Sequence, residues 1–206
     1  MLQTGTIVGG STALSIVAGG SWMPGDLDLV VATRYFNRLR DYLVDQGFFF
    51  DETLSRDIKH KYGSPRLYKF IYRCFTKGTL KIDVCVCSPN YDDMTPAEFI
   101  LTYHLSFAMN FVSGEGAYCL FPVETFSGRG YRNKFTLKER TELILAKYAA
   151  RGYTEILDKY DDSDPDRSVY LHERYPCSEE NRIMIGDIEN IWCMKLPLST
   201  KENQYS

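Results

Sequence analysis

The sequence predicts an α/β fold, in which a sheet is flanked by helices. Apolar runs rich in β-forming residues, at 67–75 and 81–86, predict strands. Apolar residues that recur at helical spacing, as at 35–44, predict helices that cover the sheet. The chain has 206 residues, of which 44% are hydrophobic, so it is long enough to bury a core of its own.

Strands and helices are expected to alternate through the first half of the chain. In order, the expected elements are a strand over 5–9, a helix over 11–17, a strand from Asp26, a helix over 35–44 and strands over 67–75 and 81–86. We expect Ser11 to cap the first helix and Gly19-Gly20 to end it. A turn at Lys77-Gly78 would join the last two strands as a hairpin, and the apolar run 48–50 would lie in the core.

Helical spacing also predicts two helices in the second half of the chain. The first begins at Thr95-Pro96, with a proline in its first turn. The residues on its apolar side would be Phe99, Ile100, Tyr103, Phe107 and Phe111. The second helix covers 136–151 and ends at Gly152.

These patterns predict two parts, a core over residues 1–135 and a C-terminal helical or mixed appendage over residues 136–206. Within the appendage, residues 158–166 are acidic and rich in turn formers. They lack the glycine and the glutamate that a calcium loop uses, so we expect a solvated linker. The polar tail at 199–206 is expected to be disordered.

Charge and hydropathy limit the classes of partner. A formal net charge of −3 and a pI near 5.7 argue against a broad nucleic-acid-binding surface and disfavour a long polynucleotide partner. No apolar run is long enough to span a membrane, and the N-terminus lacks the basic segment of a signal sequence. We therefore expect a soluble, intracellular, cytoplasmic protein with no membrane partner.

The six cysteines show no spacing typical of a disulfide-rich secreted protein. They are Cys74, Cys85, Cys87, Cys119, Cys177 and Cys193. Several fall in strand-like runs, so we expect reduced thiols that fill the core. No paired C-x-x-C spacing is present, which argues against a zinc site.

Two acids, Asp26 and Asp28, stand at the head of the apolar run 29–31. Because residues i and i+2 of a strand point to one face, both carboxylates would point to the same place, while Leu27 and Leu29 enter the core. An isolated Asp-x-Asp pair is usually a solvated turn or a helix cap. Two carboxylates held this close by a strand instead favour a divalent cation.

A third acid, Asp83, lies in the strand predicted over 81–86. Ile82 and Val84 would point to one face of that strand, and Asp83 would share the other face with Lys81. The strand therefore offers one more carboxylate to a cation site.

The corner Gly9-Gly10-Ser11 opens the first predicted helix. Backbone N–H groups, a hydroxyl and the positive end of a helix together suit an anion such as phosphate. A lone Gly-Gly-Ser sequence is usually a turn. Here it precedes the acidic strand in order, which favours a paired phosphate and metal site.

In this order the motifs resemble those of the nucleotidyltransferase superfamily, which includes polymerase-beta-like enzymes, poly(A) polymerases and CCA-adding enzymes. The residues at the family's motif positions are Gly10, Ser11, Asp26, Asp28 and Asp83. Four segments resemble fungal members of that superfamily in sequence: 10–14, 22–28, 109–111 and 147–153. The resemblance implies a nucleotidyltransferase-type mixed sheet flanked by helices.

The resemblance also implies an activity, the transfer of a nucleoside monophosphate from an NTP to a hydroxyl acceptor with release of pyrophosphate. Asp26 and Asp28 would hold two Mg²⁺ or Mn²⁺ ions. Asp83 would complete the metal site on the acceptor side and help to deprotonate the attacking hydroxyl.

Four further residues are expected to serve the nucleotide. Gly10 and Ser11 would bind the β- and γ-phosphates. Lys81 would neutralise phosphate charge, or would merely balance the carboxylate cluster. Asn110 lies in a segment that resembles a helix beside the nucleotide pocket of the fungal members; the alternatives are that Asn110 is an ordinary polar surface residue and that His104 is a half-buried structural histidine.

The sequence leaves the acceptor open among a small molecule, RNA and protein. It also leaves two other classes of function open. One is a catalytically inactive binding or regulatory module with the same fold, against which the intact set of three acids argues. The other is a toxin- or antitoxin-like modifier that places a nucleotide on RNA or protein.

Overall fold

The computed structural model describes residues 1, 3–61, 67–87, 95–133, 138–156, 188 and 190–196. Along the chain the elements are β1 (Ile7–Val8), α1 (Gly10–Ala18), β2 (Leu27–Ala32), α2 (Thr33–Asp45), β3 (Phe49–Lys61), β4 (Leu67–Lys77), β5 (Leu80–Cys87), α3 (Pro96–Ile100), the 3-10 turn η1 (Ser106–Ala108), β6 (Asn110–Val112), β7 (Gly116–Cys119), α4 (Pro122–Ser127), β8 (Arg129–Gly130), α5 (Lys138–Ala149), β9 (Thr154–Glu155) and β10 (Trp192–Lys195). The predicted α/β class is confirmed.

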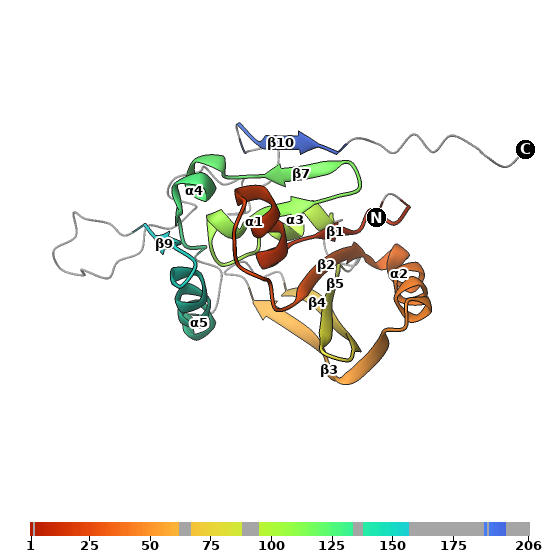
Figure 1. Ribbon diagram of the computed structural model, residues 1–206. Coiled ribbons are helices and arrows are strands. Elements are labelled where there is room, and N and C mark those ends of the chain that lie inside the picture. Colours follow the sequence, from red (N-terminus) through yellow and green to blue (C-terminus); the bar gives the residue numbers. More distant parts are fainter. Residues whose placement is uncertain are drawn as a thin grey trace, which may run out of the picture.

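One large mixed sheet organises the molecule (Figure 1). Its strand order is β10-β7-β6-β1-β2-β5-β4-β3, and a separate short pair joins β8 to β9. Within the large sheet, β2 and β5 run parallel, whereas the other neighbouring strands run antiparallel. The sheet is therefore mixed, and its parallel pair lies near the middle.

The two faces of the parallel pair carry different cores, as the alternation of side chains predicts. On one face the buried residues pack with α2; they are Leu29, Val31, Leu39, Leu43, Phe75, Ile82, Val84 and Val86. On the other face, Val30, Cys85 and Cys87 pack with residues of α3 and β6. Asp28 and Asp83 belong to this second face, because each lies two residues before one of its core residues.

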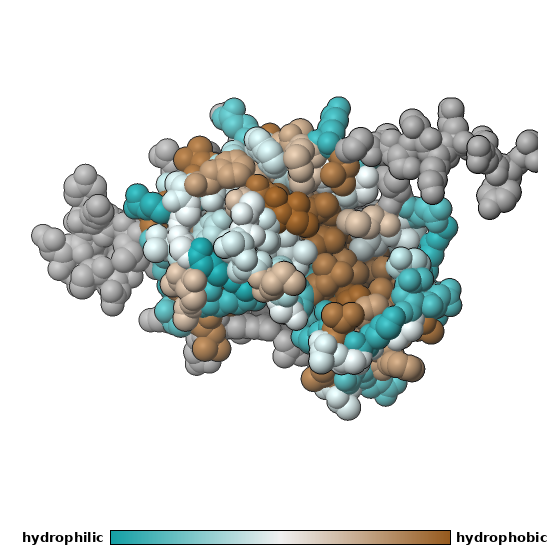
Figure 2. Space-filling view, viewed as in Figure 1, coloured by the Kyte–Doolittle hydropathy of each residue, from teal (hydrophilic) through white to brown (hydrophobic). Residues whose placement is uncertain are grey.

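Hydrophobic side chains also reach the surface of the molecule. In the view of Figure 2 they form a strip between α1 and α2. Among the exposed apolar residues is Ile16 of α1. No helix among the described residues is long and apolar enough to cross a membrane.

The predicted hairpin between β4 and β5 is confirmed, since Lys77 pairs with Leu80 around Gly78 at φ 58°. The expectation that residues 48–50 lie in the core is wrong for two of the three. Phe49 is 75% exposed and Phe50 is 39% exposed. The reason is that β3 is the edge strand of the sheet, so its first residues have a neighbouring strand on one side only.

Helix α1 confirms the predicted first helix, and Gly19 ends it in the left-handed conformation at φ 66°. The expected cap is wrong. Gly9 occupies the N-cap position without any side-chain cap, and Ser11 lies inside the helix, where it is buried. Gly10, at the first position of the helix, has a positive φ of 59°, a conformation that favours glycine.

The helix predicted from Thr95 to Phe111 is wrong beyond Ile100. Helix α3 has five residues, with a capping box between Thr95 and Glu98. The N–H groups of residues 101–103 still donate to carbonyls three residues back, but the helix does not continue, and from His104 the backbone also bonds to distant segments before it forms β6. For example, the Ser106 N–H donates to the Tyr131 carbonyl at 3.0 Å.

Helix α5 confirms the helix expected over 136–151. Beyond it, β10 pairs antiparallel with β7, so the large sheet takes one strand from the part expected to be an appendage. The division at residue 135 stays a prediction. The acidic linker at 158–166 and the tail at 199–206 lie outside the described residues.

The described cysteines are free thiols, as expected. Four of them fill the core and are buried; they are Cys74, Cys85, Cys87 and Cys119. Cys193 on β10 is exposed, and Cys177 lies outside the described residues.

Candidate metal centre

Three carboxylates meet at the end of the parallel strand pair. Asp26, Asp28 and Asp83 each offer one oxygen, and these oxygens all lie within 4.8 Å of one another. The register explains the convergence, because Asp28 on β2 pairs directly with Asp83 on β5. Asp26 precedes β2 by one residue and lies two residues from Asp28, as in the sequence pattern. The structure thus brings together the three acids that the sequence singled out.

The cluster carries unfavourable negative charge. Burial, and then the charges of Asp26 and Asp83, raise the pKa of Asp28 to about 6. Asp83 is itself buried. A cation bound here would relieve both the repulsion and the cost of burying the Asp28 charge.

Lys81 provides part of that compensation. Its Nζ lies 2.5 Å from Asp83 Oδ2. Burial alone would lower the pKa of Lys81, but the hydrogen bond to Asp83 and the nearby carboxylates raise it above its usual value. In this arrangement the lysine balances the carboxylate cluster, which is one of its two expected roles.

The glycine corner touches the same cluster. The Gly9 N–H donates to the Asp28 carbonyl at 2.9 Å, and the Thr12 hydroxyl donates to the Asp26 carbonyl at 3.1 Å. A Cβ added to Gly10 would lie 1.9 Å from Asp28 Oδ2. Only a glycine therefore lets the start of α1 approach the Asp28 carboxylate this closely, and the corner and the acids form one site.

Ser11 has an unsatisfied hydroxyl within this corner. The residue is 1% exposed, and its Oγ has no hydrogen-bond partner among the residues that the structure describes. A buried hydroxyl without a partner is uncommon and calls for an explanation such as a bound group or an ordered water. The orphaned oxygen at the start of α1 is compatible with a phosphate ligand.

Asn110 is placed differently from the expectation. Its side chain is fully buried at the start of β6, and its Nδ2 donates to the Phe107 carbonyl at 2.7 Å. The amide oxygen has no partner. Strand β6 packs against α1 and pairs with β1, so Asn110 lies in the layer that supports the glycine corner. The contacts described for Asn110 do not include any of the three acids.

Three residues near the cluster were not predicted as site residues. The Tyr103 hydroxyl lies over Gly9, where an added Cβ would come within 2.4 Å of it. Burial, and then the charge of Asp28, raise the pKa of Tyr103 and of Tyr148. The Lys147 ammonium on α5 opposes the rise in the pKa of Asp28. In the sequence, Lys147 and Tyr148 stood out only within a segment that resembled fungal proteins.

The donor set fits a hard divalent ion. Three carboxylates offer oxygen ligands at one point, and within the described residues no thiol or imidazole joins that group. Oxygen ligands from carboxylates are those that Mg²⁺ and Mn²⁺ prefer. The cluster can therefore hold a divalent cation, whose identity the geometry leaves open.

Comparison with known proteins adds little. No family model matches the chain, and no curated protein matches it. Among solved structures, a CCA-adding enzyme of Thermotoga maritima complexed with tRNA is similar, with 14% sequence identity and a TM-score of 0.31. The match covers 54% of this chain and 22% of the enzyme. At this TM-score we derive neither fold nor function from the likeness.

Proposed function

We propose that this protein is a metal-dependent nucleotidyltransferase, which moves a nucleoside monophosphate from an NTP to a hydroxyl acceptor and releases pyrophosphate. One observation carries the proposal. Three carboxylate oxygens lie within 4.8 Å of one another, on two adjacent strands, beside a glycine corner that opens a helix. That arrangement joins a cation site to an anion site, and both are what a metal-bound triphosphate requires.

The three acids would have different roles in holding Mg²⁺ or Mn²⁺. Asp26 and Asp28 would hold ions on the nucleotide side, and Asp83 would complete the site on the acceptor side. When bound, such ions neutralise charge on the phosphoryl oxygens and favour ionisation of the attacking hydroxyl. The carboxylates bind metal in their ionised form; without metal the pKa of Asp28 is about 6, so metal should compete with protons for Asp28 and bind more weakly below that pH.

The proposed transfer is a single displacement at the α-phosphorus. The acceptor hydroxyl oxygen forms a bond to the α-phosphorus, while the bond from that phosphorus to the bridging oxygen of the β-phosphate breaks. Pyrophosphate leaves with the bonding electrons, and the Asp83 carboxylate helps to accept the hydroxyl proton. Positioning and electrostatic stabilisation do most of the work in such a transfer.

The phosphates would bind at the start of α1. Gly10 and Ser11 would offer backbone N–H groups, and Ser11 also has a hydroxyl without a partner among the described residues. Lys81 would shift its ammonium from Asp83 toward the phosphates once divalent ions bind. The side chains of Asn110 and Ser11 are both buried, so a direct contact of either with a nucleotide would require neighbouring side chains to move. Membership of a fungal group stays a prediction.

The experiment is a transfer screen with each α-labelled NTP in Mg²⁺ or Mn²⁺. Acceptors are offered as pools of small hydroxyl compounds, tRNA and protein. The wild type and Asp45→Asn, an exposed acid on α2, should transfer label or release pyrophosphate. Asp28→Asn should lose about 100-fold or more of the rate. Failure of all metal-dependent NTP turnover, or full activity in Asp28→Asn, would overturn the proposal; tight NTP binding without turnover would indicate an inactive binding module.

A further inference from the structure

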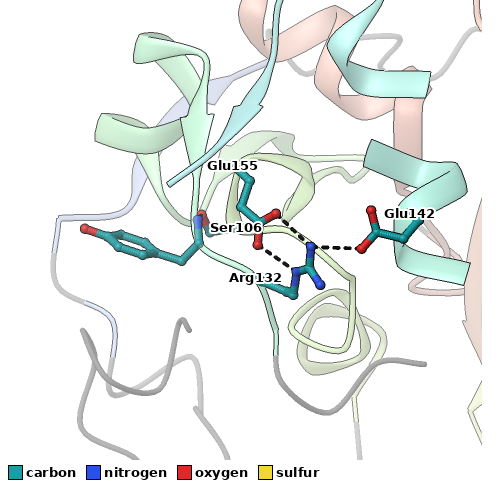
Figure 3. A network of polar contacts seen from close by, with 5 residues as sticks. Ser106, Arg132, Glu142 and Glu155 are labelled. Carbon is teal, nitrogen blue, oxygen red and sulfur yellow. Dashed lines mark hydrogen bonds and ion pairs between the residues drawn. The ribbon is translucent and has the colours of Figure 1, made fainter. Parts of the chain in front are cut away.

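A partly buried arginine joins the segment from α5 to β9 to the core. Arg132 forms a two-pronged contact with Glu155, from Nε at 2.6 Å and from Nη2 at 2.8 Å. The same Nη2 donates to Glu142 at 3.2 Å (Figure 3). The Arg132 and Glu155 side chains are 13% and 9% exposed, so this fork is largely shielded from water. Shielding and two-pronged geometry make such a pair strongly directional.

The partners of Arg132 lie on the two elements of one segment. Glu142 belongs to α5, and Glu155 belongs to β9, which follows it. The Arg132 backbone, in contrast, is fixed to the core through an isolated bridge to Leu105. Its neighbour Asn133 donates its N–H to the His104 carbonyl at 2.8 Å. Arg132 is thus anchored on the core side and reaches the segment from α5 to β9 with its side chain.

The other contacts of that segment are less directional. The parallel pairing of β8 with β9 covers two residues on each strand. Tyr148 and Tyr153 pack their rings on Phe107, with ring centres 5.2 Å and 4.8 Å apart. Apolar packing of this kind holds the segment against the core but permits small shifts, whereas a two-pronged ion pair fixes distance and orientation.

The position of α5 matters because the helix packs against α1, which opens at the glycine corner of the site. Tyr148 packs in a core that includes Leu14 of α1 and Phe107 of η1. In addition, the charge of Lys147 lowers the pKa of Asp28, and the charge of Asp28 raises the pKa of Tyr148. A shift of α5 would therefore move a cation and an aromatic side chain relative to the proposed metal and nucleotide site.

We propose that Arg132 is a positioning residue, whose fork to Glu155 and Glu142 holds α5 against the site of nucleotidyl transfer. This inference rests on the proposed function. The fork determines where α5 lies relative to bound nucleotide. The three acids bind metal independently of the fork.

A tryptophan supplies a readout that does not depend on activity. The centres of the Trp22 and Tyr153 rings lie 5.9 Å apart, and the Arg151 guanidinium lies 5.5 Å from the centre of the Trp22 ring. Both contacts come from the turn between α5 and β9. With Trp192→Phe as background, Trp22 is the sole tryptophan of the chain, and its emission reports whether this segment stays docked.

The test compares Arg132→Lys and Arg132→Gln with Arg40→Gln, which removes an exposed ion pair on α2. In both Arg132 variants we expect Trp22 emission to shift to longer wavelength and the KM for NTP to rise about tenfold. Mn²⁺ affinity and kcat should change less than about threefold. Arg40→Gln should match the wild type, and exchange of the two charges in Arg132→Glu with Glu155→Arg should restore part of the loss.

Two results would overturn the inference. One is wild-type Trp22 emission and KM in Arg132→Lys and Arg132→Gln. The other is an equal loss of Mn²⁺ affinity and nucleotide affinity, which would indicate a general structural role. A wild type without any NTP turnover would refute the proposed function instead, and the Trp22 emission would still decide whether the fork holds α5.

Discussion

At the scale of single residues, the contact between Gly10 and Asp28 defines the site. A side chain at position 10 would occupy the space of a carboxylate oxygen, and the backbone there has a positive φ of 59°. Sequence patterns identified both residues because each belongs to a short motif. The contact between them was not predictable, since it depends on how α1 docks against the parallel strands.

Gly10→Ala is expected to weaken Mn²⁺ binding about tenfold or more, because the new Cβ would lie 1.9 Å from Asp28 Oδ2 and displace the carboxylate. Gly19→Ala is the matched control. Gly19 has a similar φ of 66° but no atom within 4 Å of an added Cβ. Both variants should lose about 1 kcal/mol or more of stability from backbone strain, and only Gly10→Ala should lose metal affinity in calorimetry. Equal metal binding in the two variants would contradict this contact.

The Asp28 pKa of about 6 predicts how stability depends on pH in the absence of metal. The native state binds this proton more tightly than the unfolded state, whose carboxyl has a pKa near 3.8. Stability therefore falls as the pH rises from about 4 to about 6, by about 3 kcal/mol from this group, and stays lowered at neutral pH. Asp28→Asn should remove that loss.

The measurement is urea unfolding in a chelator at several pH values, with Asp45→Asn as control. The stability of Asp28→Asn relative to the wild type should grow between pH 4 and pH 6 and then level off. A difference that is independent of pH would mean that Asp28 titrates normally in the native protein.

At the scale of elements, short-range patterns predicted β1, β2, β4 and β5 but did not predict the other strands of the structure. Alternation along β2 and β5 assigned each residue to its face, because a strand buried on both sides still alternates its side chains. The hairpin between β4 and β5 followed from the Lys77-Gly78 turn. Backbone pairing with near neighbours in the chain is what such patterns encode.

The same patterns failed where distant segments compete for the backbone. Phe99, Tyr103 and Phe107 recur every four residues, which fits a helix, yet only the first of them lies in α3. After one further turn at residues 101–103, the chain bonds to residues 131–133. The position of α5 was not predictable either, because helical spacing indicates which face of a helix is buried but not which element packs against it.

Ser106→Ala tests whether bonds to the segment near residue 131 stabilise the non-helical chain after α3. The buried Ser106 Oγ accepts a hydrogen bond from the Tyr131 N–H at 3.0 Å, and the variant would leave that N–H without its partner. We expect a loss of about 1–3 kcal/mol in urea unfolding. Ser127→Ala removes an exposed hydroxyl on α4 and should change stability by less than about 0.5 kcal/mol. Similar, small effects in both variants would contradict the role assigned to Ser106.

At the scale of the whole molecule, the two edge strands of the large sheet come from distant parts of the chain. Strand β3 forms one edge, and β10 forms the other, on the far side of β7. Trp192 of β10 packs beside Val17, Ala117 and Cys119. The C-terminal strand thus covers part of the core that α1 shares with β7, and α1 in turn carries the glycine corner.

Gly116→Ala is expected to loosen this edge. An added Cβ would lie 2.6 Å from the Met194 carbonyl oxygen, so β10 would have to move away from β7. We expect a loss of about 1–3 kcal/mol and faster hydrogen exchange at residues 192–195. Gly25→Ala, where no atom lies within 4 Å of an added Cβ, is the control. Unchanged exchange in Gly116→Ala would show that the edge strand is not held by this close approach.

The most direct test of the proposed site is the number of Mn²⁺ ions that the protein binds beside a non-hydrolysable NTP analogue, measured from the resonance signal of free Mn²⁺. The wild type should bind about two ions per chain at saturation. Asp83→Asn should lose the acceptor-side ion and keep most of its affinity for the analogue, and the double variant Asp26→Asn with Asp28→Asn should bind neither ion at these concentrations. Wild-type stoichiometry and affinity in the double variant would contradict the assignment of the three acids as a metal centre.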